Sequence, residues 1–555
     1  MRTFRASIRS GPFAVVVVVL LVLFLWTETF SQERPPDSPH PDIFKTADQC
    51  MACHNGLVTD WGEDISIGSD WRASMMANSA RDPYWQAAVR REVTDHPAAS
   101  AEIQNECSRC HMPMSTFEAN LAGREGEVFS HLPAHPASGR ADRLAADGVS
   151  CTTCHQITDE NLGTRASFVG HFRIDTTKVE QRTVYGPFEV DSGRSRIMHS
   201  ASGFEQKQGL HVQSSELCAT CHTLYTNALG PDGEVIGELP EQVPYLEWRH
   251  SDYRGEQSCQ SCHMPVVEEP TEIASVMGQE RDSVSRHVFR GGNFFMLRML
   301  NRYRSELGVE ARPQELFASA HRTVEHLKSE AATVTVEDVR VREGRLTAEV
   351  EVTNLAGHKL PTAYPSRRSW LHVTVLNRRG ETVFESGRFR EDGSIAGNDN
   401  DVNADRYEPH YRTISSEEEV QIYEAIMTGP DGEVTTGLLT ATQFVKDNRI
   451  LPRGFEKETA GEDIAVQGAA FGDPDFRGGS DRMRYEVDVS DEEAPFSVKA
   501  ELWYQPIAYR WARNLDPYDT EETDRFVGYF ESMSEISGIV VASGSARTSS
   551  TSSRR

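Results

Sequence analysis

Apolar and polar residues alternate along much of the second half of the chain. The stretch 333–352 (TVTVEDVRVREGRLTAEVEV) and the stretch 370–376 (WLHVTVL) carry an apolar residue at nearly every second position. This period is typical of half-buried β-strands. Glycine-containing turns such as NRRGE, EDGS, GPDGE and GDPDFRGG separate such stretches. The pattern predicts an all-β sandwich of immunoglobulin or fibronectin type over residues 333–543.

The first half of the chain has a different pattern. A helix-like run, PQELFASAHRTVEHLKSEAA, lies within residues 301–332 and predicts a helical linker. Residues 40–300 show no sustained period and are rich in Gly, Pro, Ser and Asp, so we expect short helices joined mostly by loops. The fold class expected is therefore α+β and multidomain, with a helical and loop-rich first domain followed by the β-sandwich.

Both ends of the chain read as segments outside these domains. Three arginines precede an apolar run of 14 residues, 13–26, which is within the roughly 7–15 residues of a signal-peptide core and short of the ~20 of a membrane span. We interpret residues 1–31 as a signal peptide, with an uncleaved N-terminal membrane anchor as the alternative. Either predicts an exported protein, periplasmic or at the cell surface. Residues 544–555 are Ser-rich and predicted to be disordered.

The chain is strongly acidic, with a formal net charge of −27 over 555 residues. This charge argues against nucleic acid or an anionic membrane surface as a partner. An acidic surface serves solubility in many proteins, and it also suits docking to basic partner proteins.

All ten cysteines fall into five C-x-x-C-H frames, whose first residues lie 41 to 67 positions apart. On a helical turn, positions i, i+3 and i+4 share one face, so two sulfurs and one imidazole converge. This is the attachment motif of c-type haem, in which the sulfurs bind the porphyrin and the histidine becomes an iron ligand. The predicted haem-attachment residues are Cys50, Cys53, Cys107, Cys110, Cys151, Cys154, Cys218, Cys221, Cys259 and Cys262, and the predicted proximal ligands are His54, His111, His155, His222 and His263.

Two other uses of paired cysteines need weighing. Ten cysteines in an exported protein could form five disulfides, and C-x-x-C pairs could be zinc knuckles. Neither requires a histidine after every second cysteine, and zinc sites would need the pairs in even number. We therefore predict five covalently attached haem c groups. The spacing is too short for five separate cytochrome domains, so the haems are expected to form the core of one unit over 40–300.

Several segments around these motifs resemble multihaem cytochromes related to hydroxylamine oxidoreductase and its tetrahaem electron acceptor. The matching stretches are DWRASMMANSARDPYW (70–85), DGVSCTTCHQ (147–156), SELCATCHTLYT (215–226), CQSCHMP (259–265), HVFRGGNFF (287–295) and GHKLPTAYPSRR (357–368). The resemblance covers roughly residues 45–370. It implies that histidines in three of these contexts are distal haem ligands, which gives His287 and His358 here. In the first context this chain has Met76 in place of the histidine; methionine is also a legitimate axial ligand, and core packing is the alternative.

Five irons require five distal ligands if none is open. His287, His358 and Met76 are joined in this prediction by His199, in a further position that resembles a recurring one, and by His96, shortly before the second motif. His131 and His135 are competitors for the last two places. His358 lies on a Gly- and Pro-flanked turn of the β-rich half, so we expect it to reach across to a haem of the first domain.

One further cluster, GNDNDVNAD (397–405), combines carboxylates and amides of the kind that Ca²⁺ prefers. Its spacing does not follow the EF-hand rule, and a solvated acidic loop is the preferred interpretation. No serine-protease triad, phosphate-binding loop or H-E-x-x-H occurs in the sequence.

These observations predict a pentahaem c-type cytochrome that transfers single electrons between redox partner proteins outside the cytoplasm, in respiratory electron transport. The alternative is a multihaem reductase or oxidase that acts on a small nitrogen or sulfur compound at a haem with an open distal site. All five motifs end in histidine, which argues against the nitrite-reductase type of enzyme. For this reason no catalytic residue is assigned.

Overall fold

The computed structural model describes residues 42–134, 139–178 and 181–548, which lie in one compact unit that begins at Asp42. The proposed signal peptide, His135 and most of the Ser-rich tail lie outside the described residues. Residues 544–547 of that tail form the end of a strand, so the prediction of disorder is wrong there. Among the described residues no helix is long and apolar enough to cross a bilayer.

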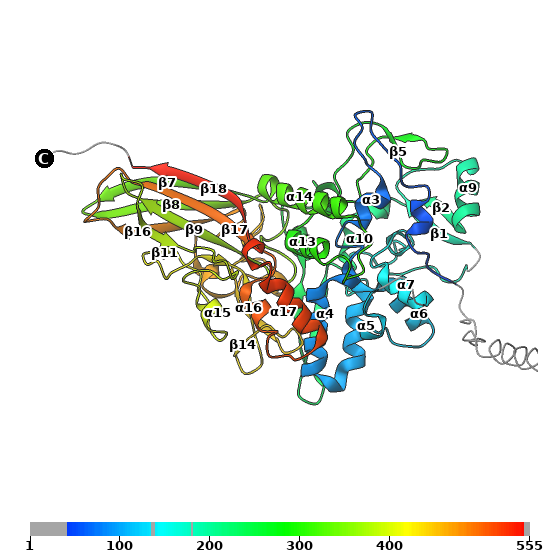
Figure 1. Cartoon of the computed structure of the whole chain (residues 1–555), viewed down its shortest axis with the longest axis horizontal. Helices are drawn as coiled ribbons and strands as arrows, with labels where there is room; N and C mark the ends of the chain where they lie inside the picture. The colour runs from blue at the N-terminus through cyan, green and yellow to red at the C-terminus, as the bar shows by residue number, and fades with distance from the viewer. Residues whose placement is uncertain (1–41, 135–138, 179–180, 549–555) are drawn as a thin grey trace, which may run out of the picture. The chain divides into compact units, whose positions relative to one another are not determined.

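Short helices dominate the described chain up to residue 293, and several of them carry a C-x-x-C-H motif (Figure 1). The helices are α2 (Asp48–Met51), α3 (Ile67–Arg72), α4 (Pro83–Asp95), α5 (Ser100–His111), α6 (Pro113–Leu121), α7 (Arg140–Ala146), α8 (Cys151–Cys154), α9 (Ser192–Ser202), α10 (Ser215–Ala219), α11 (Pro244–Arg249) and α12 (Cys259–His263). Three small two-stranded sheets lie between them: β1 (Arg182–Gly186) with β2 (Phe204–Gln208), β3 (Leu224–Leu229) with β4 (Val235–Gln242), and β5 (Thr271–Glu272) with β6 (Glu280–Arg281).

The expectation of mostly loops between the motifs is wrong over residues 83–121, where α4, α5 and α6 follow one another. Helix α4 begins sharply because the Asp82 carboxylate accepts hydrogen bonds from the backbone N–H groups of Tyr84 and Trp85, and Pro83 occupies the first helical position. Val89 and Val93, four residues apart on α4, are both buried, so one face of this helix packs inward.

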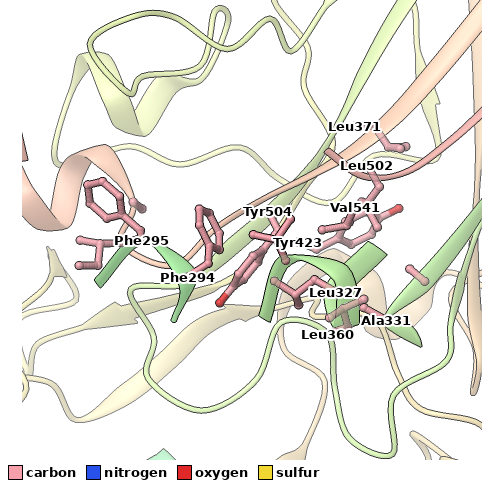
Figure 2. Close-up of a cluster of buried hydrophobic side chains, with 14 of the residues drawn as sticks. Phe294, Phe295, Leu327, Ala331, Leu360, Leu371, Tyr423, Leu502, Tyr504 and Val541 are labelled. Atoms are coloured by element: carbon pink, nitrogen blue, oxygen red, sulfur yellow. The ribbon is translucent and has the colours of Figure 1, made fainter. Parts of the chain in front are cut away.

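Helices α13 (Phe294–Arg302) and α14 (Pro313–Glu330) connect the motif-bearing part to the β-rich part. Helix α14 contacts α3 as well as strands β7 and β18. Figure 2 shows Phe294, Phe295 and Leu327 in the same cluster of buried side chains as Leu502 and Val541 of the β-rich part. The helices predicted as a linker therefore lie within a core that they share with the sheets.

The β-rich part contains two larger sheets that share this core. Its elements are β7 (Ala332–Arg342), β8 (Arg345–Asn354), β9 (Arg368–Leu376), β10 (Thr382–Ser386), α15 (Asp399–Val402), β11 (Thr413–Ile414), β12 (Ile422–Tyr423), β13 (Ala425–Thr428), β14 (Val434–Thr435), β15 (Gln443–Asp447), β16 (Ser480–Asp488), β17 (Ser497–Gln505), α16 (Tyr509–Arg513), α17 (Glu521–Glu531) and β18 (Ile539–Arg547). One sheet has the order β10-β9-β17-β18, with β12 also paired to β9; the other has the order β11-β16-β8-β7.

The alternating pattern of the sequence is realised in these strands. Along β8, Leu346, Ala348, Val350 and Val352 are fully buried, while the residues between them are partly exposed. The prediction of strands in this half is confirmed, whereas the immunoglobulin- or fibronectin-type topology and the domain boundaries at 300 and 333 stay predictions.

The acidic stretch 397–405 matches the expected solvated loop only in part: Asp399 and Asp405 are exposed, whereas Asp401 is not. Asp401 is buried, and its carboxylate pairs with the Arg368 guanidinium at 2.7 and 3.0 Å. The same carboxylate accepts a hydrogen bond from the backbone N–H of Ile395. A buried carboxylate needs a charged partner, and Arg368 provides it. Asp401 therefore stabilises the interior of the β-rich part and is not a solvated side chain.

Candidate haem-binding site

Each C-x-x-C-H motif lies on or next to a helical turn, as the shared-face argument requires. Cys50 lies within α2 and Cys218 within α10, α5 ends at His111, and α8 and α12 begin at Cys151 and Cys259. All ten cysteines lie in the described part of the chain and are half-buried, and none of them forms a disulfide there.

The five motifs also lie close to one another. The thiol of Cys50 interacts with that of Cys151, and the thiols of Cys110 and Cys221 interact in the same way. The Cys218 thiol interacts with Cys259, and this contact lowers the pKa of Cys259 to about 7. Residues far apart in sequence are thus gathered into one site, as expected for cofactors that share a unit.

Four of the five motif histidines have one ring nitrogen hydrogen-bonded to a backbone carbonyl. The Nδ1 atoms lie 2.6 Å from Ile273 O for His54, 3.1 Å from Ser79 O for His111, 2.6 Å from Tyr185 O for His155 and 2.5 Å from Arg290 O for His263. A carbonyl can only accept, so the proton is on Nδ1 and the Nε2 lone pair is available to a metal. Among the described residues, His222 lacks such a carbonyl partner.

Burial keeps His111 and His263 neutral. Desolvation lowers the pKa of His111 and of His263 to about 4. The neutral imidazole is the form that binds a metal ion. Trp85 stacks on the His111 ring at 4.3 Å with an interplanar angle of 4°, which fixes the orientation of that ring.

His287 lies opposite the third motif histidine. The ring centroids of His155 and His287 are 6.3 Å apart, and the rings are inclined by 24°. Two imidazoles on opposite sides of one metal, with bonds of about 2 Å, place their centroids roughly 6 Å apart. His287 Nδ1 lies 3.2 Å from Ser285 O, which leaves its Nε2 free. This pair therefore fits a bis-histidine haem.

His358 stands in the same relation to the fifth motif histidine. The centroids of His263 and His358 are 6.3 Å apart with an interplanar angle of 9°, and His358 Nδ1 lies 2.9 Å from Lys359 O. His326 of α14 is also near, 6.1 Å from His263 at 69°, with its Nδ1 3.4 Å from a Glu330 carboxylate oxygen. His358 is the better candidate because its Nδ1 is held by a backbone carbonyl, as in the motif histidines. His326 was not among the ligand candidates from the sequence, and the structure places it beside this motif.

A buried ionic network anchors the His358 turn. Lys359 Nζ lies 2.6 Å from Asp447, and Arg449 lies 2.8 Å from Asp447 and 2.9 Å from Glu247 of α11. Glu247 also accepts hydrogen bonds from the Lys359 N–H and the Thr362 hydroxyl. These charged side chains are almost fully buried, so each depends on the others. The network joins the turn between β8 and β9 to a helix of the motif-bearing part.

The other three predicted distal ligands have less definite surroundings. Met76 is half-buried on a turn after α3, and its carbonyl accepts a hydrogen bond from Val149, just before motif 3. Met75 packs against the main hydrophobic core. His199 is exposed on α9, a helix that contacts α2 of motif 1. His96 follows α4, and its Nε2 is 3.4 Å from the Thr440 hydroxyl in the β-rich part. Ligation by these residues stays a prediction.

His131 has a hydrogen-bond partner at Nδ1 that leaves its Nε2 free, whereas the Nε2 of His96 lies near the Thr440 hydroxyl. His131 Nδ1 lies 2.7 Å from the Asp142 carboxylate, a partner that fixes the tautomer and leaves Nε2 free. Its neighbours Phe129 and Leu132 pack against the same cluster as Cys107 of motif 2. Sequence reasoning ranked His131 behind His96, because the carboxylate partner eleven residues later is brought close only by helix α7.

A buried group outside the motifs combines one histidine with two carboxylates. His410 Nε2 lies 3.2 Å from Asp473 and 3.9 Å from Asp481. The side-chain amides of Gln421 and Asn448 both point their N–H groups at His410 Nδ1. The histidine proton is therefore on Nε2 and faces Asp473, so this group forms a hydrogen-bonded cluster rather than a set of metal ligands. In the described residues it is also the only such cluster of potential ligands, and no motif cysteine belongs to it, in contrast to the zinc-knuckle alternative.

Comparison with known proteins gives one structural likeness. No family model matches the sequence, and no curated protein matches it either. Among solved structures, a penta-heme cytochrome c552 from Thermochromatium tepidum matches with a TM-score of 0.53 and 15% sequence identity, over 92% of this chain and 100% of that chain. At this identity the likeness is one of fold, and a relationship to hydroxylamine oxidoreductase stays a prediction. The fold of this chain, β-rich part included, is similar to that of a multihaem c-type cytochrome.

Proposed function

We propose that this protein is a pentahaem c-type cytochrome that transfers single electrons. The observation that carries the proposal is the arrangement of the motif histidines: four donate Nδ1–H to carbonyls, and two of these face a second histidine at 6.3 Å. The cytochrome fold supports it independently.

In this proposal the ten motif cysteines attach five haems, and the five motif histidines are the proximal ligands. His287 and His358 are the distal ligands for the haems of motifs 3 and 5. We assign His131 rather than His96 to the haem of motif 2, and retain Met76 and His199 as candidates for the other two. Bound haem supplies an iron that alternates between Fe(III) and Fe(II) and so accepts and releases one electron.

The chain's own residues do the remaining work. The backbone carbonyls hold the imidazole rings in one tautomer, so ligation needs no proton movement at Nδ1. The buried Glu247–Arg449–Asp447–Lys359 network keeps the His358 turn in place. Close contacts between motifs, such as Cys218 with Cys259, bring neighbouring haems together for electron transfer along the chain.

The ligand assignment can be tested on the purified protein. We expect five haems per chain by mass spectrometry, low-spin EPR signals from the oxidised protein and no optical response to cyanide. His287→Ala should convert one haem to a high-spin form that binds cyanide, whereas His321→Ala, at an exposed position of α14, should leave the spectra unchanged. A low-spin, cyanide-insensitive His287→Ala protein would contradict the assignment. A high-spin component in the wild type would favour the reductase or oxidase alternative.

We further propose that the protein acts outside the cytoplasm, in the periplasm or at the cell surface, between an electron donor and an electron acceptor protein. The N-terminal sequence supports export, and the net charge of −27 supports basic partners. Fractionation of cells, with detection of covalent haem in each fraction, tests the location.

A further inference from the structure

Two loops enclose the first C-x-x-C-H motif, and we name them together the loop pair: residues 57–65 and residues 264–285. The second loop supplies the carbonyl of Ile273, which holds His54 Nδ1 at 2.6 Å. The same loop donates the Ser275 N–H to the carbonyl of Cys53 at 2.8 Å.

The two loops also contact each other. The Asp60 N–H donates to the Glu269 carboxylate at 3.0 Å, and Leu57, Ile65 and Val267 form a small buried cluster. In Figure 1 this region lies around strand β5, beside α3 and α9. The loop pair therefore covers motif 1 on one side.

The loop pair exposes large apolar side chains to solvent. Trp61 is 89% exposed at the tip of its loop, and Met277 is 63% exposed. Val58, Val266 and Val276 are between 46% and 58% exposed. A single exposed apolar residue needs no explanation, but five on two loops around one motif do. Tryptophan and methionine are also enriched at protein interfaces.

The same loops are acidic. They contain eight carboxylates and a single basic residue, Arg281, whose guanidinium is half-buried, stacks over Phe188 and donates to the Glu189 carbonyl. Two arginines adjoin the loops: Arg286 pairs with Glu63, and Arg194 donates to the carbonyls of Met277 and Gly278, so the other seven carboxylates carry the acidic character. The carboxylates are Asp60, Glu63, Asp64, Glu268, Glu269, Glu272, Glu280 and Asp282. An apolar centre with an acidic surround fits a partner that has an apolar contact face ringed by lysine or arginine.

We propose that the loop pair is the docking surface for a basic single-electron carrier protein, and that the haem of motif 1 is the port through which electrons pass to or from it. This inference rests on the proposed function. In each encounter one electron leaves a reduced iron of one protein and reduces the oxidised iron of the other, with no proton or atom transferred. A second copy of this chain is disfavoured as the occupant, because two such acidic surfaces would repel each other.

The test measures electron transfer from the reduced holoprotein to an oxidised, lysine-rich monohaem cytochrome c by stopped-flow absorbance at low ionic strength. The triple variant Asp60→Lys, Glu268→Lys and Asp282→Lys should slow the bimolecular rate by tenfold or more, roughly the lower end of electrostatic steering effects. The difference should shrink as salt is raised to about 0.5 M. A control variant with the same charge change in the β-rich part, Glu337→Lys, Asp491→Lys and Glu493→Lys, should react as the wild type does.

A second pair of variants tests the apolar part of the surface. Trp61→Ser should weaken binding of the probe, measured by calorimetry, by about tenfold. Val402→Ser, which removes a 79% exposed side chain elsewhere, should leave binding unchanged.

Equal rates for the two charge variants, or no reaction with the basic probe, would overturn the proposal. Sedimentation that shows wild-type dimers dissociated by Trp61→Ser would overturn it in favour of a second copy of the chain. Absence of covalent haem from the purified protein is a different result, since it refutes the proposed function itself before any partner is added.

Discussion

The motif-bearing part and the β-rich part hold their chains together in different ways. The β-rich part shares one large hydrophobic core with α13 and α14, in which strand positions such as Val350, Val373 and Leu502 are fully buried. Residues 42–293 contribute few members to that core and otherwise join smaller clusters, two of which also include residues of the β-rich part, such as Leu439 and Phe455. Aliphatic packing specifies one part, and contacts among motifs, hydrogen-bonded histidines and buried ions specify the other.

If the protein binds haem as proposed, this comparison predicts that the motif-bearing part depends on the haems for its folding, while the β-rich part does not. The largest effect is expected from Cys151→Ser with Cys154→Ser, which removes the attachment of the haem at motif 3. We expect loss of folded protein over residues 42–293, seen as protease sensitivity, with the β-rich part still resistant. Thr153→Val is the control, because this residue is a variable position of the same motif and attaches no haem. It should keep the full haem content.

A smaller but still large effect is expected where the two parts are joined by buried charges. Burial alone would raise the pKa of Asp447, but Arg449 and Lys359 lower it well below its usual range. Asp447→Asn leaves both cations poorly compensated and should cost about 3–5 kcal/mol of unfolding free energy, measured by denaturant titration. Because the pKa of Asp447 is depressed on folding, its contribution is present above about pH 4 and is lost as the pH falls further.

The matched control for that change is an exposed ion pair of the sheets. Glu486 pairs with two exposed arginines on the surface of the β-rich part, Arg345 at 3.1 Å and Arg484 at 2.9 Å. Glu486→Gln should change the unfolding free energy by less than about 1 kcal/mol. Similar costs for the two substitutions would show that the buried network does not join the parts.

The buried carboxylate of Glu241 gives a pH-dependent test in the motif-bearing part. Burial raises its pKa to about 7, and the Thr226 hydroxyl donates to it at 2.5 Å. The folded state therefore holds this proton more tightly than the unfolded state, so stability falls as the pH rises from about 5 to 8. Glu241→Gln should remove about 2–3 kcal/mol of that pH dependence, whereas Glu337→Gln on exposed β7 should not. Parallel pH profiles for wild type and Glu241→Gln would contradict the prediction.

The smallest effect concerns one reduction potential. Methionine ligation raises the potential of a haem relative to two histidines. If Met76 is a ligand, Met76→His should lower one of the five potentials, on the order of 100 mV, in a spectroelectrochemical titration. Met75→Leu should leave all five unchanged, and an unchanged titration for Met76→His would assign Met76 to packing.

The sequence was most informative where the chemistry is local. A C-x-x-C-H frame is complete within five residues, so its position could be predicted without knowledge of the fold. The strand pattern is equally local, and β7, β8 and β9 appear where alternation predicts them. Helices α4 to α6 were missed because their polar faces and the Asp82 cap carry little apolar periodicity.

Distal ligands depend on residues far apart in the chain, and there the sequence was less informative. The approach of His287 to His155 and of His358 to His263 agrees with the resemblance to multihaem cytochromes. For His96 and His131 no such context existed, and the deciding contact with Asp142 is a product of folding. The partner of Asp401 could not be foreseen either, since Arg368 lies on a different element.

The position of His358 has a consequence for how the protein matures. In the proposed exported cytochrome, His263 would leave the export machinery before His358, and the turn that carries His358 is secured by Asp447 and Arg449, which would follow later still. We therefore expect the fifth haem to be attached while its far side is unprotected, and to acquire its final ligand only when the last part of the chain has been delivered. A truncated chain without His358 would carry an iron with an open coordination position. Delivery of the β-rich part would therefore complete the ligation of the fifth haem.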